Sequence, residues 1–199
     1  MNYTTLAAAV LLATGLAFAA PSITAVPTGW IVAGTSPQSY EVGTDPQGGS
    51  ARQPAAFMRA KEDTHGFGTL MQMVQATDYL GKRVRFSANV RTVDVARYST
   101  LWMRVDGPRG PDGGAKMLAF DNMMSRPIKG TTGWQRYEVV LDVPPEARAI
   151  GFGLGVSGLG SAWMDDVKLE VVPDTVPTTG TLPSPPEYPR QPQNLGFTR

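Results

Sequence analysis

Hydrophobic and polar side chains alternate one by one through much of the middle of the chain. Strict alternation places the apolar side chains on one face of an extended strand, so each segment of this kind is predicted to be a half-buried β-strand. The regular segments are residues 83–91, 101–106, 136–143, 149–157 and 163–171. Less regular strands are expected in residues 29–33, 55–60 and 67–75.

Turn residues separate these segments, and no amphipathic pattern of helical length lies between them. Many short strands without intervening helices predict an all-β fold, and we expect an antiparallel β-sandwich. In the last strand, Trp163 is in phase with Val167 and Leu169, and we expect all three side chains to face inward together with Asp165.

The segment 149–157 carries large apolar side chains in one phase and Gly151, Gly153 and Gly155 in the other. Glycine weakens the interior of a strand, and a row of glycines along one face indicates that another backbone, a loop or a ligand lies close there. We therefore expect a shallow groove on this face of the sheet, with a closely packed loop as the alternative.

Polar and aromatic side chains share the outward phase of the strand at 101–106, and the nearby segment 117–122 ends in two further polar residues. A tryptophan offers a flat apolar surface to a pyranose ring, while arginine, carboxylate and amide groups hydrogen-bond to its hydroxyls. The candidate ligand-binding residues are Trp102, Arg104, Asp106, Gln72, Asp121 and Asn122. The alternatives are that residues 107–116 or the tail cover Trp102, and that Arg104 and Asp106 simply pair across strands.

Composition excludes several other functions. The formal net charge is +1, and no block of like charge is present, so the sequence lacks the basic patch that is typical of nucleic-acid-binding proteins. Cysteine is absent, which rules out disulfides and thiolate chemistry. His65 is the only histidine, and no nucleophile motif accompanies it. Carboxylate pairs such as Asp121 with Asp106 or Glu138 can hydrolyse glycosides, so a small glycoside hydrolase is a third hypothesis. We nevertheless predict that the protein is not an enzyme.

The two ends of the chain differ from the middle. Residues 6–18 are apolar, too short to span a bilayer comfortably, and followed by small residues, so residues 1–19 are predicted to be a signal peptide. The mature protein would then be exported, periplasmic or secreted, without a transmembrane span. Residues 173–199 are rich in proline and are expected to form a disordered or extended tail. The sandwich domain is accordingly placed at residues 23–172.

The stretch 162–170, with Trp163 and the pair Asp165 and Asp166, resembles the final strand of the galactose-binding-like, CenC-type carbohydrate-binding modules. The segment 133–137 resembles the tryptophan-containing segment that precedes a strand in that family. The resemblance implies a β-jelly-roll. It also implies a structural calcium held by Asp165 or Asp166, for which Glu41 and Asp45 are partner candidates; no other cofactor is expected.

A narrower likeness covers residues 66–72, 101–106 and 126–130. These segments resemble an uncharacterised bacterial variant of the same sandwich that occurs in some proteins labelled transcriptional regulators. No helix-turn-helix segment is visible in this sequence, so the DNA-binding label does not carry over.

Taken together, these features predict an exported, non-catalytic module that binds a saccharide or another polar ligand. The competing prediction is a structural or protein-interaction component of the cell envelope, in which the same face meets a protein partner and the proline-rich tail helps it to dock.

Overall fold

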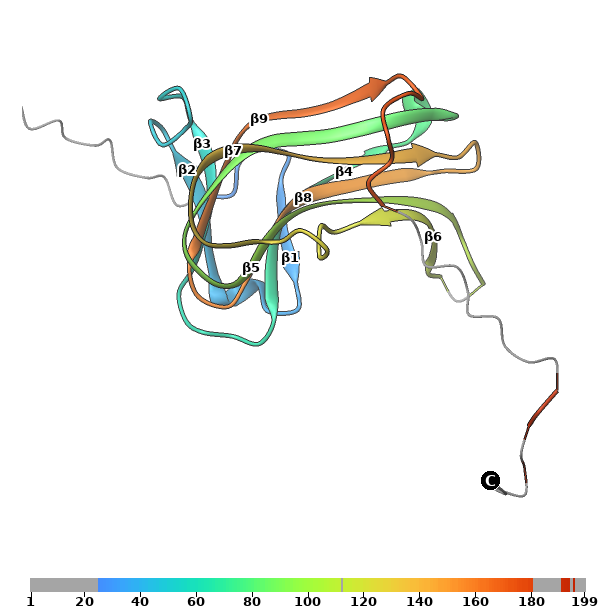
Figure 1. The fold of residues 1–199 in the computed structure, drawn as a ribbon, viewed down its shortest axis with the longest axis horizontal. Coiled ribbons are helices and arrows are strands. Elements are labelled where there is room, and N and C mark those ends of the chain that lie inside the picture. Colours follow the sequence, from blue (N-terminus) through green and yellow to red (C-terminus); the bar gives the residue numbers. More distant parts are fainter. Residues whose placement is uncertain (1–24, 112, 181–190, 194, 196–199) are drawn as a thin grey trace, which may run out of the picture.

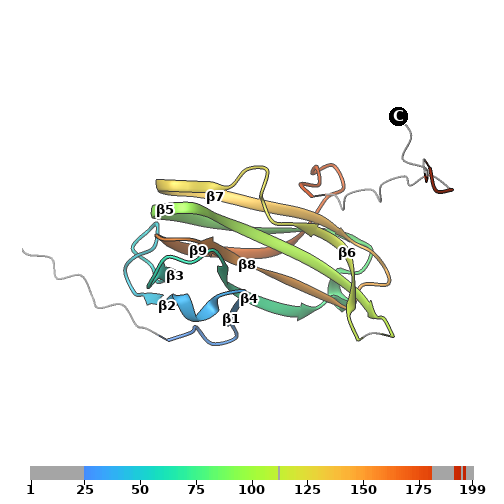
Figure 2. The same cartoon turned by 90° about the horizontal axis from the view of Figure 1, so that it is seen from below.

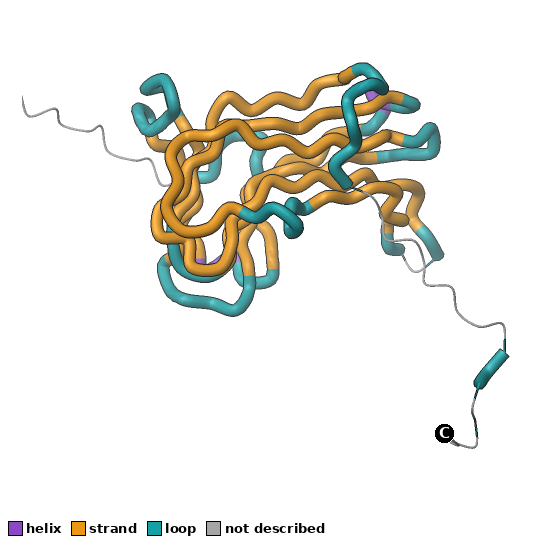
Figure 3. The backbone as a smooth tube through the Cα atoms, in the orientation of Figure 1, coloured by secondary structure: helices purple, strands orange, loops and turns teal. Residues whose placement is uncertain are grey.

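Strands make up most of the computed structural model, which describes residues 25–111, 113–180, 191–193 and 195 (Figures 1 and 3). The predicted signal peptide lies outside these residues, as does most of the tail beyond residue 180. The strands are β1 Ile31–Gly34, β2 Tyr40–Asp45, β3 Ala55–Ala60, β4 Phe67–Gln75, β5 Lys82–Arg109, β6 Ala115–Asp121, β7 Ile128–Val143, β8 Ala149–Ser157 and β9 Ser161–Val172. Two single-turn 3-10 helices, Pro37–Ser39 and Thr77–Tyr79, connect them. Among the described residues, no helix has the length and apolarity needed to cross a membrane.

The long strand β5 belongs to both layers of the molecule (Figure 2). Its second half pairs with β8 and β6, and its first half pairs with β9 and β7. Between the halves the pairing with β7 shifts register, and Asp94 there has a φ of +52°, as expected where a strand bends sharply. We call β1, β4, β8, the second half of β5 and β6 the front sheet, and β2, β3, β9, the first half of β5 and β7 the back sheet.

All strand pairs are antiparallel, and the predicted all-β sandwich is confirmed. The core lies between the two sheets and is made by the apolar phase of each alternating segment. Phe86 of the back sheet and Phe152 of the front sheet meet there with ring centroids 4.9 Å apart. The strands predicted at 83–91 and 101–106 are one continuous strand, and the sequence analysis did not identify β2 or β6 as strands.

The phase predicted for β9 is wrong for Trp163 and Asp165, and Val167, which was expected to face inward, is also exposed. Met164, which pairs with Val90, faces the core, so Trp163 and Asp165 lie on the outer face of the back sheet. A bulge between Asp165 and Lys168 switches the phase, and Asp166 within it has a φ of +45°. The prediction assumed unbroken alternation, which a bulge of this kind does not preserve.

The chain stays ordered beyond the predicted domain end at residue 172. The amide of Thr179 donates to the carbonyl of Val140 in β7 at 2.9 Å, and its Oγ1 accepts from the Val140 amide at 2.8 Å. Arg83 donates to the carbonyls of Asp174 and Val176. Thr179 therefore satisfies backbone groups at the edge of β7, and the carbonyls of Asp174 and Val176 bind the guanidinium of Arg83 in β5.

Candidate functional site

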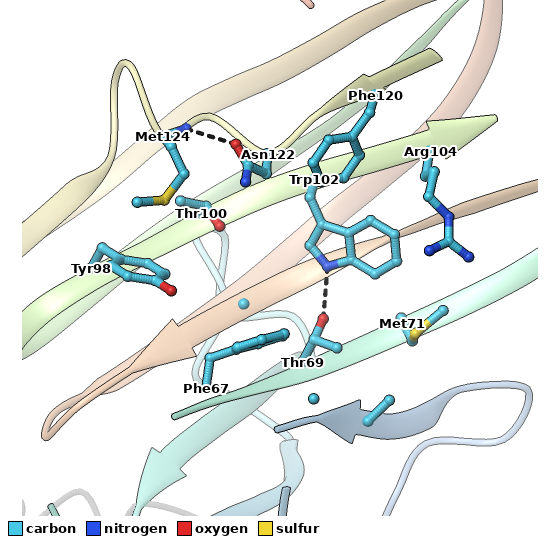
Figure 4. A pocket seen from close by; sticks show the side chains of 13 residues that line it. Phe67, Thr69, Met71, Tyr98, Thr100, Trp102, Arg104, Phe120, Asn122 and Met124 are labelled. Atoms are coloured by element: carbon cyan, nitrogen blue, oxygen red, sulfur yellow. Dashed lines mark hydrogen bonds between the residues drawn. The ribbon is translucent and has the colours of Figure 1, made fainter. Parts of the chain in front are cut away.

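A groove of about 320 Å³ lies on the outer face of the front sheet (Figure 4). It is lined mainly by aromatic and small side chains from all five strands, together with the residues that follow β6. The lining residues are Ala33, Gly34, Phe67, Thr69, Met71, Tyr98, Thr100, Trp102, Arg104, Phe120, Asn122, Met124 and Gly155. Two ligand-binding residues predicted from the outward phase of β5, Trp102 and Arg104, are among them.

The indole of Trp102 lies across β8 and is fixed at its far side by β4 (Figure 4). Its Nε1 donates to Oγ1 of Thr69 at 2.7 Å, and this hydroxyl donates in turn to the carbonyl of Leu154 at 3.0 Å. The indole is half-buried, and none of the described residues in the segment 107–116 lines the groove. The ring is thus held in one orientation before a ligand arrives, which lowers the entropy cost of binding.

The glycine row of β8 explains this placement of the indole, although only one glycine leaves open space. A Cβ added at Gly151 would lie 3.4 Å from the indole carbon Cζ3 of Trp102 and closer still to Met73. At Gly153 it would lie 2.3 Å from the carbonyl oxygen of Leu70. At Gly155 its nearest neighbour would be Oγ1 of Thr100 at 3.4 Å, and this glycine forms part of the groove wall.

Arg104 and Asp106 point to the same side of β5 and form an ion pair. Nε and Nη2 of Arg104 both donate to Oδ2 of Asp106, at 3.1 and 2.9 Å. The Asp106 side chain is only 6% exposed, whereas the Arg104 side chain is 43% exposed. Asp106 therefore orients the guanidinium, and Arg104 is the partner that a ligand can reach.

The structure separates two of the predicted residues from the groove. Gln72 pairs with Phe152, so it shares the inward phase of β4 and lies on the opposite face of the sheet from Trp102. Asp121 pairs with Met103 and is also turned inward, where it accepts hydrogen bonds from Arg126 and from the Met123 amide.

Asn122 does line the groove, and its Oδ1 accepts from the Met124 amide at 3.2 Å (Figure 4). The sequence analysis did not identify several other lining residues. Tyr98 and Thr100 share the outward phase of β5 with Trp102, so extending the alternation upstream would have found them. Phe67 and Thr69 share one phase of β4, but nothing in the sequence states which phase faces outward.

The carboxylates considered for a hydrolase do not meet in this groove. No described Asp or Glu is among its lining residues; Asp106 is bound by Arg104, and Glu138 lies 3.5 Å from Arg85 on the back sheet. His65 is exposed in the loop before β4.

The residues predicted to hold calcium have protein partners, although the buried Oδ1 of Asp165 accepts no hydrogen bond from the described residues. Asp165 accepts a hydrogen bond from the Ser50 amide, which ties the β2–β3 loop to β9. Asp166 pairs with Arg136 at 2.6 Å and with Lys168 at 3.5 Å. Within the described part of the chain, no group of three or more His, Asp or Glu side chains could hold a metal ion.

Comparison with known proteins finds a relative that is similar in amino-acid sequence. The chain is 40% identical over 171 residues to the uncharacterized HTH-type transcriptional regulator YbfP of Bacillus subtilis (strain 168). The match covers 85% of this chain and 56% of the regulator, so the chain spans little more than half of that protein's length. No protein-family model matches the chain.

Solved structures that resemble this protein include carbohydrate-binding modules. The CBM22-1–GH10 modules of Clostridium thermocellum endo-1,4-beta-D-xylanase 10B, complexed with xylohexaose, superpose with a TM-score of 0.51 at 11% identity, covering 72% of this chain and 26% of that one. The CBM22-1 xylan-binding domain of Paenibacillus barcinonensis Xyn10C gives a TM-score of 0.49 at 12% identity, covering 74% and 88%. At 11% identity, the first likeness concerns the fold: this chain has a β-sandwich fold that carbohydrate-binding modules also use.

Proposed function

We propose that the protein is a non-catalytic module that binds a saccharide in the groove on the front sheet. The observation that carries this proposal is the Trp102 indole, which its hydrogen bond to Thr69 fixes in a groove that Phe67, Tyr98 and Phe120 also line. A fixed indole with one open face suits the apolar C–H face of a pyranose, and it loses little conformational freedom on binding.

Polar groups around the indole give the groove its hydrogen-bonding capacity. Arg104 has an exposed guanidinium oriented by Asp106, and Asn122 retains its amide donors because the backbone of Met124 contacts only Oδ1. Tyr98 and Thr100 add hydroxyl groups on the same side of β5. A few directional groups on an apolar surface are typical of small-molecule sites, where they fix the orientation of the ligand.

The proposal is tested by a glycan array followed by calorimetric titration of the best ligand, with xylohexaose included as a probe because a sandwich-containing xylanase fragment is complexed with it. Trp102→Ala should weaken binding at least roughly 30-fold, the equivalent of about 2 kcal/mol for a central aromatic contact. The matched control is Trp134→Ala, which removes a half-buried indole from the back sheet and should leave affinity unchanged.

Gly155→Val provides a second test that does not touch the indole. The added side chain has room at its Cβ but projects into the groove, so it should reduce affinity while the fold is retained. Unchanged binding by both Trp102→Ala and Gly155→Val, or no saccharide bound by the folded wild type, would refute the proposal.

A second candidate function rests on the 40% identity to the regulator over 85% of this chain. In that case the sandwich would be the ligand-sensing part of a regulatory protein, and the same groove would hold the effector. The two functions differ in location, because the saccharide-binding module is proposed to be exported after cleavage behind Ala19. N-terminal sequencing of the protein from its native cells separates them: a mature chain that starts at Ala20 supports export, and a retained Met1 supports the regulatory role.

A further inference from the structure

A second hollow of about 410 Å³ continues the face of the front sheet beyond Arg104. Its lining includes Met73, Asp106, Arg109, Ala115, Arg148 and Ala149. The register places it in line with the groove, because Arg104 pairs with Gly151 and Asp106 pairs with Ala149 on the same face of β8. The Arg104–Asp106 ion pair stands at the junction: its arginine lines the groove and its aspartate lines the second hollow.

The two hollows together are long enough for several sugar units. At about 3.3 Å per residue, the outward phase of β5 from Tyr98 to Asp106 spans roughly 26 Å. Met71 lines the groove and Met73, the next residue in the same phase of β4, lines the second hollow. Thioether side chains adapt their shape to varied partners, so both suit a surface that contacts a chain along its length.

The second hollow differs from the groove in its charge. Arg109 and Arg148 are both exposed, and the hydrogen bonds recorded for their side chains go to the backbone carbonyls of Gly113 and Ala147. Neither forms an ion pair with a described residue, although Asp112 lies outside the described part of the chain. Arg148 is fixed relative to β5, because its amide donates to the Asp106 carbonyl at 2.7 Å.

Most other arginines in the described part of the chain already contact a carboxylate or an aromatic ring. Those at 59, 83, 85, 97, 126 and 136 pair with carboxylates, and Arg91 stacks on Trp163. Of the three described arginines with neither an ion pair nor an aromatic contact, Arg52, Arg109 and Arg148, two line the second hollow. Among the described residues that line the hollow, Asp106 is the one carboxylate, and its Oδ2 already accepts two hydrogen bonds from Arg104.

We propose that the groove and the second hollow form one cleft that binds an acidic saccharide chain, with Trp102 stacking on one sugar ring and Arg104, Arg109 and Arg148 binding the carboxylates of uronate units. This inference rests on the proposed saccharide-binding function and adds the ligand class. Guanidinium groups bind carboxylates with two parallel N–H donors, which makes them suited to this task.

The test compares hexamers of galacturonate and mannuronate with their uncharged methyl esters in calorimetric titrations at low salt. At least one acid should bind about tenfold or more tightly than its ester, because hydrogen bonds to a charged group are stronger than neutral ones. The double variant Arg109→Gln/Arg148→Gln should clearly reduce this preference, because only Arg104 then remains to bind a carboxylate. The matched control Arg52→Gln/Lys61→Gln removes the same charge from exposed positions outside the cleft and should retain the preference.

The outcomes separate this inference from the function on which it rests. If neither acid is preferred over its ester, or if the preference is undiminished in Arg109→Gln/Arg148→Gln, the acidic ligand class is wrong. Trp102-dependent binding of a neutral saccharide would in that case leave the proposed function intact. If no acid, ester or array saccharide binds the folded protein, both fail.

Discussion

The outer faces of the two sheets both carry tryptophan, but on the back face the guanidinium of Arg91 lies over the rings of both Trp134 and Trp163. On the back sheet, Trp163 is 8% exposed and packs with the fully buried Phe57. The guanidinium of Arg91 lies 3.9 Å from the centroid of the Trp163 ring. On the front sheet, the described residues place no guanidinium or ammonium on the ring of Trp102, whose edge is fixed by Thr69. The strand phase thus places an indole on the outer face of a sheet, and the side chains around the indole determine whether a ligand can reach it.

The largest expected difference between the faces is in stability. Trp163→Ala should lower the free energy of unfolding by about 3–5 kcal/mol, because a large buried side chain leaves a cavity. Trp102→Ala removes a half-buried side chain and should cost about half as much or less. Denaturant unfolding of both variants measures the difference. Equal losses of stability would mean that the two indoles have the same structural role and would contradict the difference described between the two faces.

Alanine substitutions at two glycines of β8 should differ by a smaller amount in their effect on the free energy of unfolding. Gly153→Ala should lower the free energy of unfolding by about 1–3 kcal/mol, because the new Cβ would overlap the carbonyl oxygen of Leu70. Gly155→Ala meets only ordinary contact distances and should stay within about 0.5 kcal/mol of the wild type. Thermal or denaturant unfolding compares them directly, and a Gly155→Ala variant as unstable as Gly153→Ala would show that the groove floor is not open.

Removing the cation from the back face should have a modest effect. Arg91→Gln loses the cation–π contact with Trp163 and should reduce stability by about 0.5–2 kcal/mol. Burial lowers the pKa of Arg91, with Asp45 acting in the opposite direction. Arg52→Gln, an exposed position, is the control. If Arg91→Gln gained saccharide affinity, the back face would be a second binding surface and the contrast drawn here would be wrong.

The smallest expected effect is on stability at alkaline pH. Burial raises the pKa of Tyr40 above its ordinary value of 10.0, and burial has the same effect on Tyr137. The folded protein therefore holds these protons more tightly than the unfolded chain, so their contribution is complete below about pH 10 and is lost as the pH rises through the raised pKa values. In Tyr40→Phe/Tyr137→Phe, unfolding followed from pH 9 to 12 should show a shallower decline than in the wild type. An identical decline would contradict this assignment.

The sequence predicts the site well where one strand carries it. Trp102 and Arg104 share the outward phase of a regular segment, and Phe86 and Leu154 face the core as their alternation requires. The glycine row also indicated close approach by another group. That group is mainly the neighbouring strand β4, with the Trp102 indole close to Gly151 alone. These inferences need only the period of a strand, which is local information.

The remaining features depend on contacts between distant segments. Both phases of β4 mix apolar and polar residues, and only its register with β8 places Gln72 on the inner face. Asp121 turns inward to meet Arg126, and the bulge in β9 reverses the phase of Trp163. The alternation in one segment carries no information on a partner's register or on a bulge, so these errors have a common origin.

The most direct measurement follows the four indole N–H resonances by NMR while a saccharide selected on the array is titrated into the protein. Because Nε1 of Trp102 is hydrogen-bonded beside the groove, its resonance should shift progressively and saturate, whereas those of Trp134 and Trp163 should remain in place. A ligand that leaves the Trp102 resonance unchanged, or that shifts Trp163 instead, would contradict the account of an open front face and a closed back face.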